Sequence, residues 1–198
     1  MELKLILQIV GVVLGLLYLW LEYRASIYLW VASIVMPALY LVVYYDAGLY
    51  ADMGINIYYL LIALYGWAAW RYGFSLRRGS QGRELPISHT PTGLWLPLAG
   101  LTALLFVLLA QVLIHFTDST VPWADAFTTA LSVVGMWLLA RKYVEQWWVW
   151  LVVDVASVAL YVYKDLHFTA ALYALYAVVA IFGYRKWKQL MTLEDEKQ

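Results

Sequence analysis

Seven long apolar stretches alternate with short polar stretches along the chain. Each apolar stretch holds about 20 residues, which is the length an α-helix needs to cross the hydrocarbon core of a bilayer. The polar gaps carry turn residues and charges, and the gap at residues 71–92 is long and basic. We therefore predict seven transmembrane helices, over residues 4–22, 27–45, 53–70, 93–115, 124–140, 147–163 and 168–185.

The composition supports an all-α integral membrane protein. Hydrophobic residues make up 65% of the chain and charged residues 13%, against about 25% charged residues in soluble domains. Cysteine is absent and the three histidines lie in unrelated segments, which argues against disulfides and the usual zinc sites. A net charge of zero gives no indication of a nucleic-acid partner. We expect no metal and no cofactor.

Positive charges predict the orientation in the membrane. With seven crossings, eleven of the thirteen lysines and arginines fall on the side of the C-terminus, and Lys4 and Lys164 fall on the other. The positive-inside rule then puts the C-terminus in the cytoplasm and the N-terminus outside, in an inner (cytoplasmic) membrane. Tryptophans near the predicted cytoplasmic ends are expected to be interfacial anchors: Trp20, Trp30, Trp67, Trp70, Trp95, Trp147, Trp148 and Trp187.

The two halves of the chain resemble each other. An offset of about 120 residues pairs Trp30 with Trp150 and puts Ile34 opposite Asp154. A shorter offset pairs residues 66–70 with residues 183–187, where glycine and tryptophan recur in the same order.

This resemblance predicts two parallel three-helix repeats joined by one extra helix, a 3+1+3 plan. Repeats of this kind are a transporter architecture, with substrate bound near the membrane midplane. The predicted parts are a first repeat at 1–72, a basic cytoplasmic loop plus linker helix (about 93–115) at 73–121, a second repeat at 122–190, and a polar cytoplasmic tail at 191–198.

One carboxylate stands inside a predicted membrane helix. A charge in hydrocarbon costs several kcal/mol, so Asp154 is a candidate functional residue, and no lysine or arginine lies at similar depth. Its alternative role is structural, bonded to a tyrosine of another helix. Helical steps of three or four residues place it in a stripe that could hold a flat, positively charged molecule: Trp147, Trp150, Asp154, Ser157 and Tyr161.

Other polar and aromatic residues in the predicted helices are weaker candidates for substrate contacts. Hydroxyl and amide groups in membrane helices also bond neighbouring helices, an aspartate can cap a helix, and tyrosines can simply pack. Both roles stay open for Asp125, Thr129, Ser132, Asn56, Tyr173 and Tyr176.

Several strings resemble the Pnu family of vitamin transporters over essentially the whole membrane region. They are Ala124-Asp125-Ala126-Phe127-Thr128-Thr129-Ala130, Trp147-Trp148-Val149-Trp150 with Asp154, and the ending from Leu172-Tyr173 through Gly183-Tyr184-Arg185-Lys186-Trp187. The resemblance implies a SWEET-like fold and facilitated diffusion of a dephosphorylated vitamin, which a cytoplasmic kinase then traps by phosphorylation.

The substrate expected from this resemblance is thiamine. The nicotinamide riboside members usually have asparagine at the position of Asp154, whereas a carboxylate suits the thiazolium of thiamine. Nicotinamide riboside also carries a fixed positive charge and is the alternative. Riboflavin is neutral and gains little from Asp154.

Other classes of membrane protein fit less well. An enzyme would need convergent acids, bases or nucleophiles, and a retinal protein would need a lysine in the last helix, which residues 168–184 lack. A non-transport assembly protein is the more distant alternative, but it would not need Asp154. No P-loop motif occurs, so we predict a uniporter. Its expected partners are the vitamin and the lipid bilayer, and a homo-oligomer is compatible with the sequence.

Overall fold

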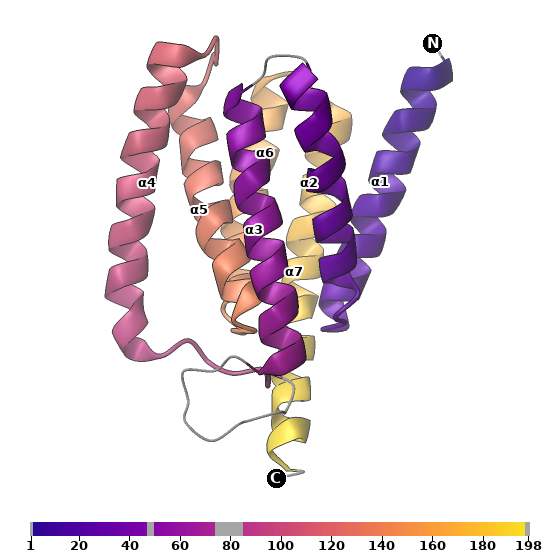
Figure 1. The fold of residues 1–198 in the computed structure, drawn as a ribbon, viewed down its shortest axis with the longest axis vertical. Helices are drawn as coiled ribbons and strands as arrows, with labels where there is room; N and C mark the ends of the chain where they lie inside the picture. Colours follow the sequence, from indigo (N-terminus) through magenta and orange to yellow (C-terminus); the bar gives the residue numbers. More distant parts are fainter. Residues whose placement is uncertain (1, 47–49, 74–84, 197–198) are drawn as a thin grey trace. The chain divides into compact units, whose positions relative to one another are not determined.

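The structure is a computed structural model that describes residues 2–46, 50–73 and 85–196. Its elements are helical (Figure 1): α1 Glu2–Tyr23, α2 Leu29–Asp46, α3 Tyr50–Tyr72, the short 3-10 helix η1 Thr92–Leu94, α4 Trp95–Phe116, α5 Pro122–Ala140, α6 Gln146–Tyr163 and α7 His167–Asp195. These bounds confirm the seven predicted helices, with one difference. The helix α7 continues to Asp195, so most of the predicted polar tail is helical. The basic residues 77–83 lie outside the described residues.

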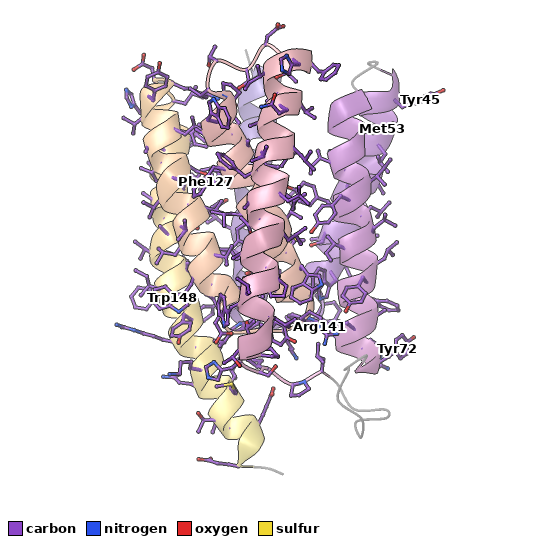
Figure 2. The ribbon with its side chains drawn as sticks, turned by 90° about the vertical axis from the view of Figure 1, so that its left-hand side faces the viewer. Tyr45, Met53, Tyr72, Phe127, Arg141 and Trp148 are labelled. Carbon is purple, nitrogen blue, oxygen red and sulfur yellow. The ribbon has the colours of Figure 1, made fainter. Side chains whose placement is uncertain are left out.

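Five helices are long and apolar enough to cross a membrane, among the residues that the structure describes. They are Met53–Tyr72, Thr92–Phe116, Pro122–Ala140, Gln146–Tyr163 and His167–Glu194, and Val12–Tyr23 is a shorter apolar part of α1. Figure 2 shows one such span, in which α3 runs from the end marked by Met53 to the end marked by Tyr72.

The chain divides into two compact units, Met1–Leu85 and Pro86–Gln198. In the first unit, α2 packs mainly against α3 and makes a smaller contact with α1. In the second unit, α4 packs on α5, α5 on α6 and α6 on α7, so each helix contacts the next one along the chain (Figure 1).

Each unit contains the same contact between a buried tryptophan and a glycine. In the first unit the Trp30 ring covers Gly66, where an added Cβ would lie 2.4 Å from Trp30 Cη2. The Trp30 ring also meets Trp70 edge-on, at 5.6 Å between ring centroids.

The second unit repeats this contact with three other residues. The Trp147 ring covers Gly183, where an added Cβ would lie 2.6 Å from Trp147 Cη2. The Trp147 and Trp187 rings meet edge-on at 5.8 Å. Close approach of a ring to a backbone requires glycine in both units, because any Cβ would occupy the space of the ring.

The turn before each of these tryptophans also follows the same course. Ala25 and Lys142 both have positive φ, 50° and 58°. Six backbone hydrogen bonds around Ala25 recur exactly 117 positions later around Lys142, beginning with Arg24 N–H to Trp20 and Arg141 N–H to Trp137. The same offset relates Gly66 to Gly183. The contacts therefore set one register of 117 between the two segments.

This register corrects two details of the sequence alignment. The structural counterpart of Trp30 is Trp147, not Trp150, and the position opposite Asp154 is Pro37, not Ile34. The alignment was wrong because tryptophans at 147 and 150 lie on adjacent turns of one helix and both satisfy a pattern of aromatic and apolar residues.

The same contacts correct part of the expected aromatic belt. Trp20, Trp67, Trp95 and Trp148 are exposed on the protein surface, as interfacial anchors must be. The other four tryptophans are buried, because two of them pack on Gly66 and Gly183 and the other two meet those rings edge-on: Trp30, Trp147, Trp70 and Trp187.

Candidate functional site

The predicted stripe of α6 is a buried face of that helix. Asp154 and Ser157 are 6% and 5% exposed, whereas Val152 and Val155 on the opposite side are about half exposed. Figure 2 shows Trp148 projecting outward from the same helix. Asp154 and Ser157 therefore face the protein interior, and their contact with substrate stays a prediction.

Two tyrosines of α7 lie close to Asp154. Its carboxyl group interacts electrostatically with Tyr173 and Tyr176. The rings of Tyr161 and Tyr173 stack at 5.1 Å between centroids and share a hydrogen bond through their hydroxyls. Tyr176 extends this group, at 5.6 Å from Tyr173. The aromatic wall that the sequence suggested therefore forms beside the carboxylate.

No lysine, arginine or histidine pairs with Asp154 among the described residues. Burying an ionised group away from water costs several kcal/mol of free energy unless a group of opposite charge lies beside it. Asp154 is buried beside aromatic rings, a setting that suits a guest with its own positive charge.

Trp150 completes the site one turn before Asp154. Its ring lies over Gly135 of α5, where an added Cβ would be 3.3 Å from Trp150 Cε2. The indole Nε1 is buried and has no hydrogen-bond partner among the described residues. Trp150 thus brings a buried indole donor to the face of α6 that carries Asp154.

Trp147 has a different place from the one that the stripe suggested. It is 1% exposed, with Gly183 against its face and Trp187 at its edge. Since the first unit repeats this arrangement around Trp30, Trp147 belongs to the packing of the helices. Its expected cation-π contact with substrate stays a prediction.

Asp125 has polar partners in two loops, and its contact with substrate stays a prediction. Ser119 Oγ donates to Asp125 Oδ2 at 2.7 Å, and Lys164 Nζ lies 3.5 Å from Asp125 Oδ1. The carboxylate therefore joins the loop before α5 to the loop after α6. An ion pair of this kind neutralises the charge that a cationic substrate would need.

For the remaining candidate residues the structure gives only partial burial or a hydrogen bond within their own helix. Ser132 Oγ donates to the carbonyl of Thr128, a bond within α5 at 2.8 Å, and Thr129 is partly buried on the same helix. Asn56 is partly buried on α3 in the first unit. These three side chains stay predictions.

Sequence reasoning missed Gln146, the first residue of α6. It is fully buried, and neither atom of its side-chain amide has a hydrogen-bond partner among the described residues. It precedes Trp150 by four residues, so it continues the face that carries Asp154. Only its polar character beside an apolar run could have drawn attention to it.

A second feature that the sequence did not suggest lies at the same end of α6. Residues 86–91, which we call the strap, run along the turn between α5 and α6, where Val144 N–H donates to the Ser88 carbonyl at 3.0 Å. His89 Nδ1 bonds Glu145 Oε1, and Thr90 donates to Glu145 Oε2 through N–H and hydroxyl, at 2.8 and 2.9 Å.

These bonds set the charge state of Glu145. Burial by itself raises the pKa of this carboxyl, but the hydrogen bonds from His89 and Thr90 outweigh burial, and the net pKa lies below its usual value. Glu145 is therefore a carboxylate that holds the strap in place. At the other end of the strap, Ile87 N–H donates to Glu194 Oε2 of α7 at 3.1 Å.

Comparison with known proteins adds the family. Residues 5–189 match the family described as "Nicotinamide mononucleotide transporter". The chain belongs to the nicotinamide mononucleotide transporter family. This match spans all seven helices up to residue 189, and it confirms the Pnu resemblance at the level of the family.

Curated relatives of this transporter family cover most of the chain. The riboflavin/roseoflavin transporter RibM of Streptomyces davaonensis is 27% identical, over 91% of this chain and 83% of its own length. The nicotinamide riboside transporter PnuC of Escherichia coli is 25% identical, over 91% and 84%. The PnuC of Neisseria mucosa is 25% identical, over 92% and 72%. Thiamine appears in none of these three names, so the thiamine branch stays a prediction.

A solved structure has the same fold. The crystal structure of the vitamin B3 transporter PnuC matches with a TM-score of 0.67 and 24% identity, over 92% of this chain and 80% of that one. The chain is thus a multi-pass membrane protein of a vitamin transporter family with the fold of PnuC.

Proposed function

We propose that this protein is a uniporter for nicotinamide riboside. The observation that carries the proposal is Asp154, a buried carboxylate beside Tyr173 and Tyr176 that has no cationic partner among the described residues. The pyridinium ring of nicotinamide riboside is flat and carries a fixed positive charge. Such a ring gains from a carboxylate and from aromatic faces in a medium of low dielectric constant.

Each side chain of the group has a role in this proposal. Asp154 acts as the counter-ion, Trp150 and Tyr173 hold the ring, and the hydroxyl groups of Tyr161 and Ser157 bond the polar substituents. Two relatives named as nicotinamide riboside transporters support this substrate.

Thiamine is the second candidate, and the same residue favours it. Its thiazolium also carries a fixed charge, and an aspartate where the nicotinamide riboside members usually have asparagine is the feature that favours thiamine. Riboflavin is the substrate in the name of the RibM relative. A neutral ring would leave the charge of Asp154 uncompensated, so we place riboflavin third.

The proposed setting follows the charges and the pattern of helices. We propose two three-helix repeats, 1–72 and 122–190, joined by α4 in a 3+1+3 plan, with the N-terminus outside and the C-terminus in the cytoplasm of an inner-membrane protein. The substrate moves down its own gradient and a cytoplasmic kinase traps it.

Counterflow in proteoliposomes tests the substrate. Vesicles that contain the purified protein and one unlabelled vitamin are diluted into the same labelled vitamin, without a proton gradient. We expect counterflow of nicotinamide riboside, competition by thiamine and none by riboflavin. Counterflow of thiamine alone would replace the first candidate by the second. Counterflow of riboflavin alone would contradict the role of Asp154 as a counter-ion.

A further inference from the structure

Three polar groups of α6 lack hydrogen-bond partners among the described residues. They are the amide of Gln146, unbonded at both Oε1 and Nε2, and the indole Nε1 atoms of Trp147 and Trp150. Buried polar groups in folded proteins are almost always bonded, and an unbonded one calls for an explanation. The amide is the stronger case, because a glutamine can make several hydrogen bonds and here makes none.

Comparison with the first unit shows which of these unbonded groups belong to the shared packing of the helices and which do not. The indole Nε1 atoms of Trp30 and Trp147 are also buried and unbonded, and these residues are counterparts at the offset of 117. An unbonded indole there comes with the packing of the ring. The counterpart of Gln146 is Leu29, which is equally buried and has no polar side chain. The counterpart of Trp150 is Ser33, which donates to the carbonyl of Leu29 at 3.0 Å.

Only the second unit, then, has an unbonded amide at this position. A leucine fills the same place in the first unit without exposure, so the turn and the packing do not require a polar side chain there. A buried amide without partners destabilises a protein compared with an apolar residue of similar shape. A group that costs stability without helping the packing is typical of a functional site.

The position of Gln146 on the helix says which function it can serve. Gln146, Trp150 and Asp154 follow one another at steps of four residues and so lie along one face of α6. Gln146 and Asp154 are eight residues apart, which is about 12 Å along the helix axis. The side chain of a helical residue leans towards the N-terminus, so the amide of Gln146 points away from the Asp154 carboxylate.

We propose that Gln146 is a second contact for the substrate, used after the substrate leaves Asp154 on its way past the α5–α6 turn. The amide bonds the uncharged polar part of the vitamin, such as a carboxamide or hydroxyl groups, and the indole Nε1 of Trp150 lies between the two contacts. This inference rests on the proposed transport function, and it assigns the amide to the passage step rather than to initial binding.

The test compares Gln146→Leu, which installs the residue of the first unit, with Gln146→Asn, which keeps an amide on a shorter side chain. The purified full chain is measured with whichever of nicotinamide riboside, thiamine and riboflavin the wild type transports in counterflow. A wild type that does not transport nicotinamide riboside contradicts the proposed function and leaves this comparison intact.

We expect Gln146→Leu to raise the melting temperature, to change the dissociation constant at equilibrium by less than about twofold, and to lower the counterflow rate by about tenfold or more, in line with the loss of one or two hydrogen bonds in the passage step. Gln146→Asn should recover part of the rate.

Two results would overturn the inference. A Gln146→Leu protein that transports at the wild-type rate would show that the amide is merely tolerated. A Gln146→Leu protein that loses melting temperature together with transport, or that does not fold, would show that the amide serves the structure.

Discussion

The turn between α1 and α2 and the turn between α5 and α6 follow the same course, yet the helices that follow them carry different side chains. After the first turn come Leu29 and Ser33, and after the second come Gln146 and Trp150. Further along, Pro37 stands opposite Asp154. The tryptophan and glycine that pack one helix on the next are the same in the two units, whereas a buried amide and a buried carboxylate stand at these positions only in the second.

The neighbouring helices, α1 in the first unit and α5 in the second, differ in the size of the residue that faces Ser33 or Trp150. Tyr18 of α1 shares a hydrogen bond with Ser33, so a large residue on α1 meets a small one on α2. In the second unit the sizes are exchanged, since Gly135 of α5 meets Trp150 of α6. The exchange moves the aromatic ring onto the helix that carries Asp154. One helical scaffold, used twice, thus carries different side chains in its two copies.

The largest effect on stability should come from adding a Cβ at the glycines that contact Trp30 and Trp147. Gly66→Ala and Gly183→Ala each put a Cβ within 2.4 to 2.6 Å of a buried ring. Each should lower the free energy of unfolding by about 1–3 kcal/mol or more, the cost of overpacking a core. Thermal denaturation of the purified protein measures the loss.

The matched controls are Gly54→Ala and Gly100→Ala, where no atom lies within 4 Å of an added Cβ. Loss of stability in only one of the pair Gly66 and Gly183 would break the comparison between the units.

A smaller effect should follow from Gly135→Ala, which disturbs the site alone. The added Cβ would lie 3.3 Å from the Trp150 ring, so the indole must move by a few tenths of an ångström. We expect affinity for the transported vitamin to fall by about threefold to tenfold, the size of a weakened cation-π contact. Isothermal titration measures it, and unchanged affinity would mean that the ring does not touch the substrate.

The smallest effect should come from the strap. Glu145→Gln removes the charge from the bonds to His89 and Thr90, and we expect the melting temperature to fall by about 2–4 °C, as for a loss near 1 kcal/mol. Tyr28, the counterpart of Glu145, is exposed, so Tyr28→Phe is the matched control without effect.

The pH dependence sharpens this prediction. Because the pKa of Glu145 is lower in the folded protein, its contribution to stability is complete above the usual value of 4.5 and is lost as the pH falls through the lowered pKa. Melting curves of the wild type should therefore show a loss at acid pH that is smaller in Glu145→Gln. If the melting temperature falls equally at acid pH in both proteins, the Glu145 carboxylate does not contribute to stability in this way.

Much of the fold could be predicted from the sequence, because hydrocarbon-length apolar runs leave few alternatives to helices. The buried face of α6 was predictable for a similar reason, since helical spacing alone brings Trp150, Asp154 and Ser157 together. The extension of α7 was not, because its last turns are polar and Glu194 bonds the strap at Ile87.

Contacts between distant segments could not be predicted from the sequence. Asp125 is paired with Lys164, 39 positions away, and no local pattern indicates that pair. The contact of the Trp147 ring with Gly183 depends on how α6 and α7 approach each other. The unbonded amide of Gln146 became informative only when the turns fixed Leu29 as its counterpart.

The most direct test of the counter-ion role is the affinity of Asp154→Asn for nicotinamide riboside, beside the control Asp125→Asn. Both changes replace a carboxylate by an amide, but Asp125 is already paired with Lys164. We expect Asp154→Asn to weaken binding by about tenfold or more at an unchanged or higher melting temperature, and Asp125→Asn to leave the affinity as it is. Equal affinity of wild type and Asp154→Asn would contradict the counter-ion role.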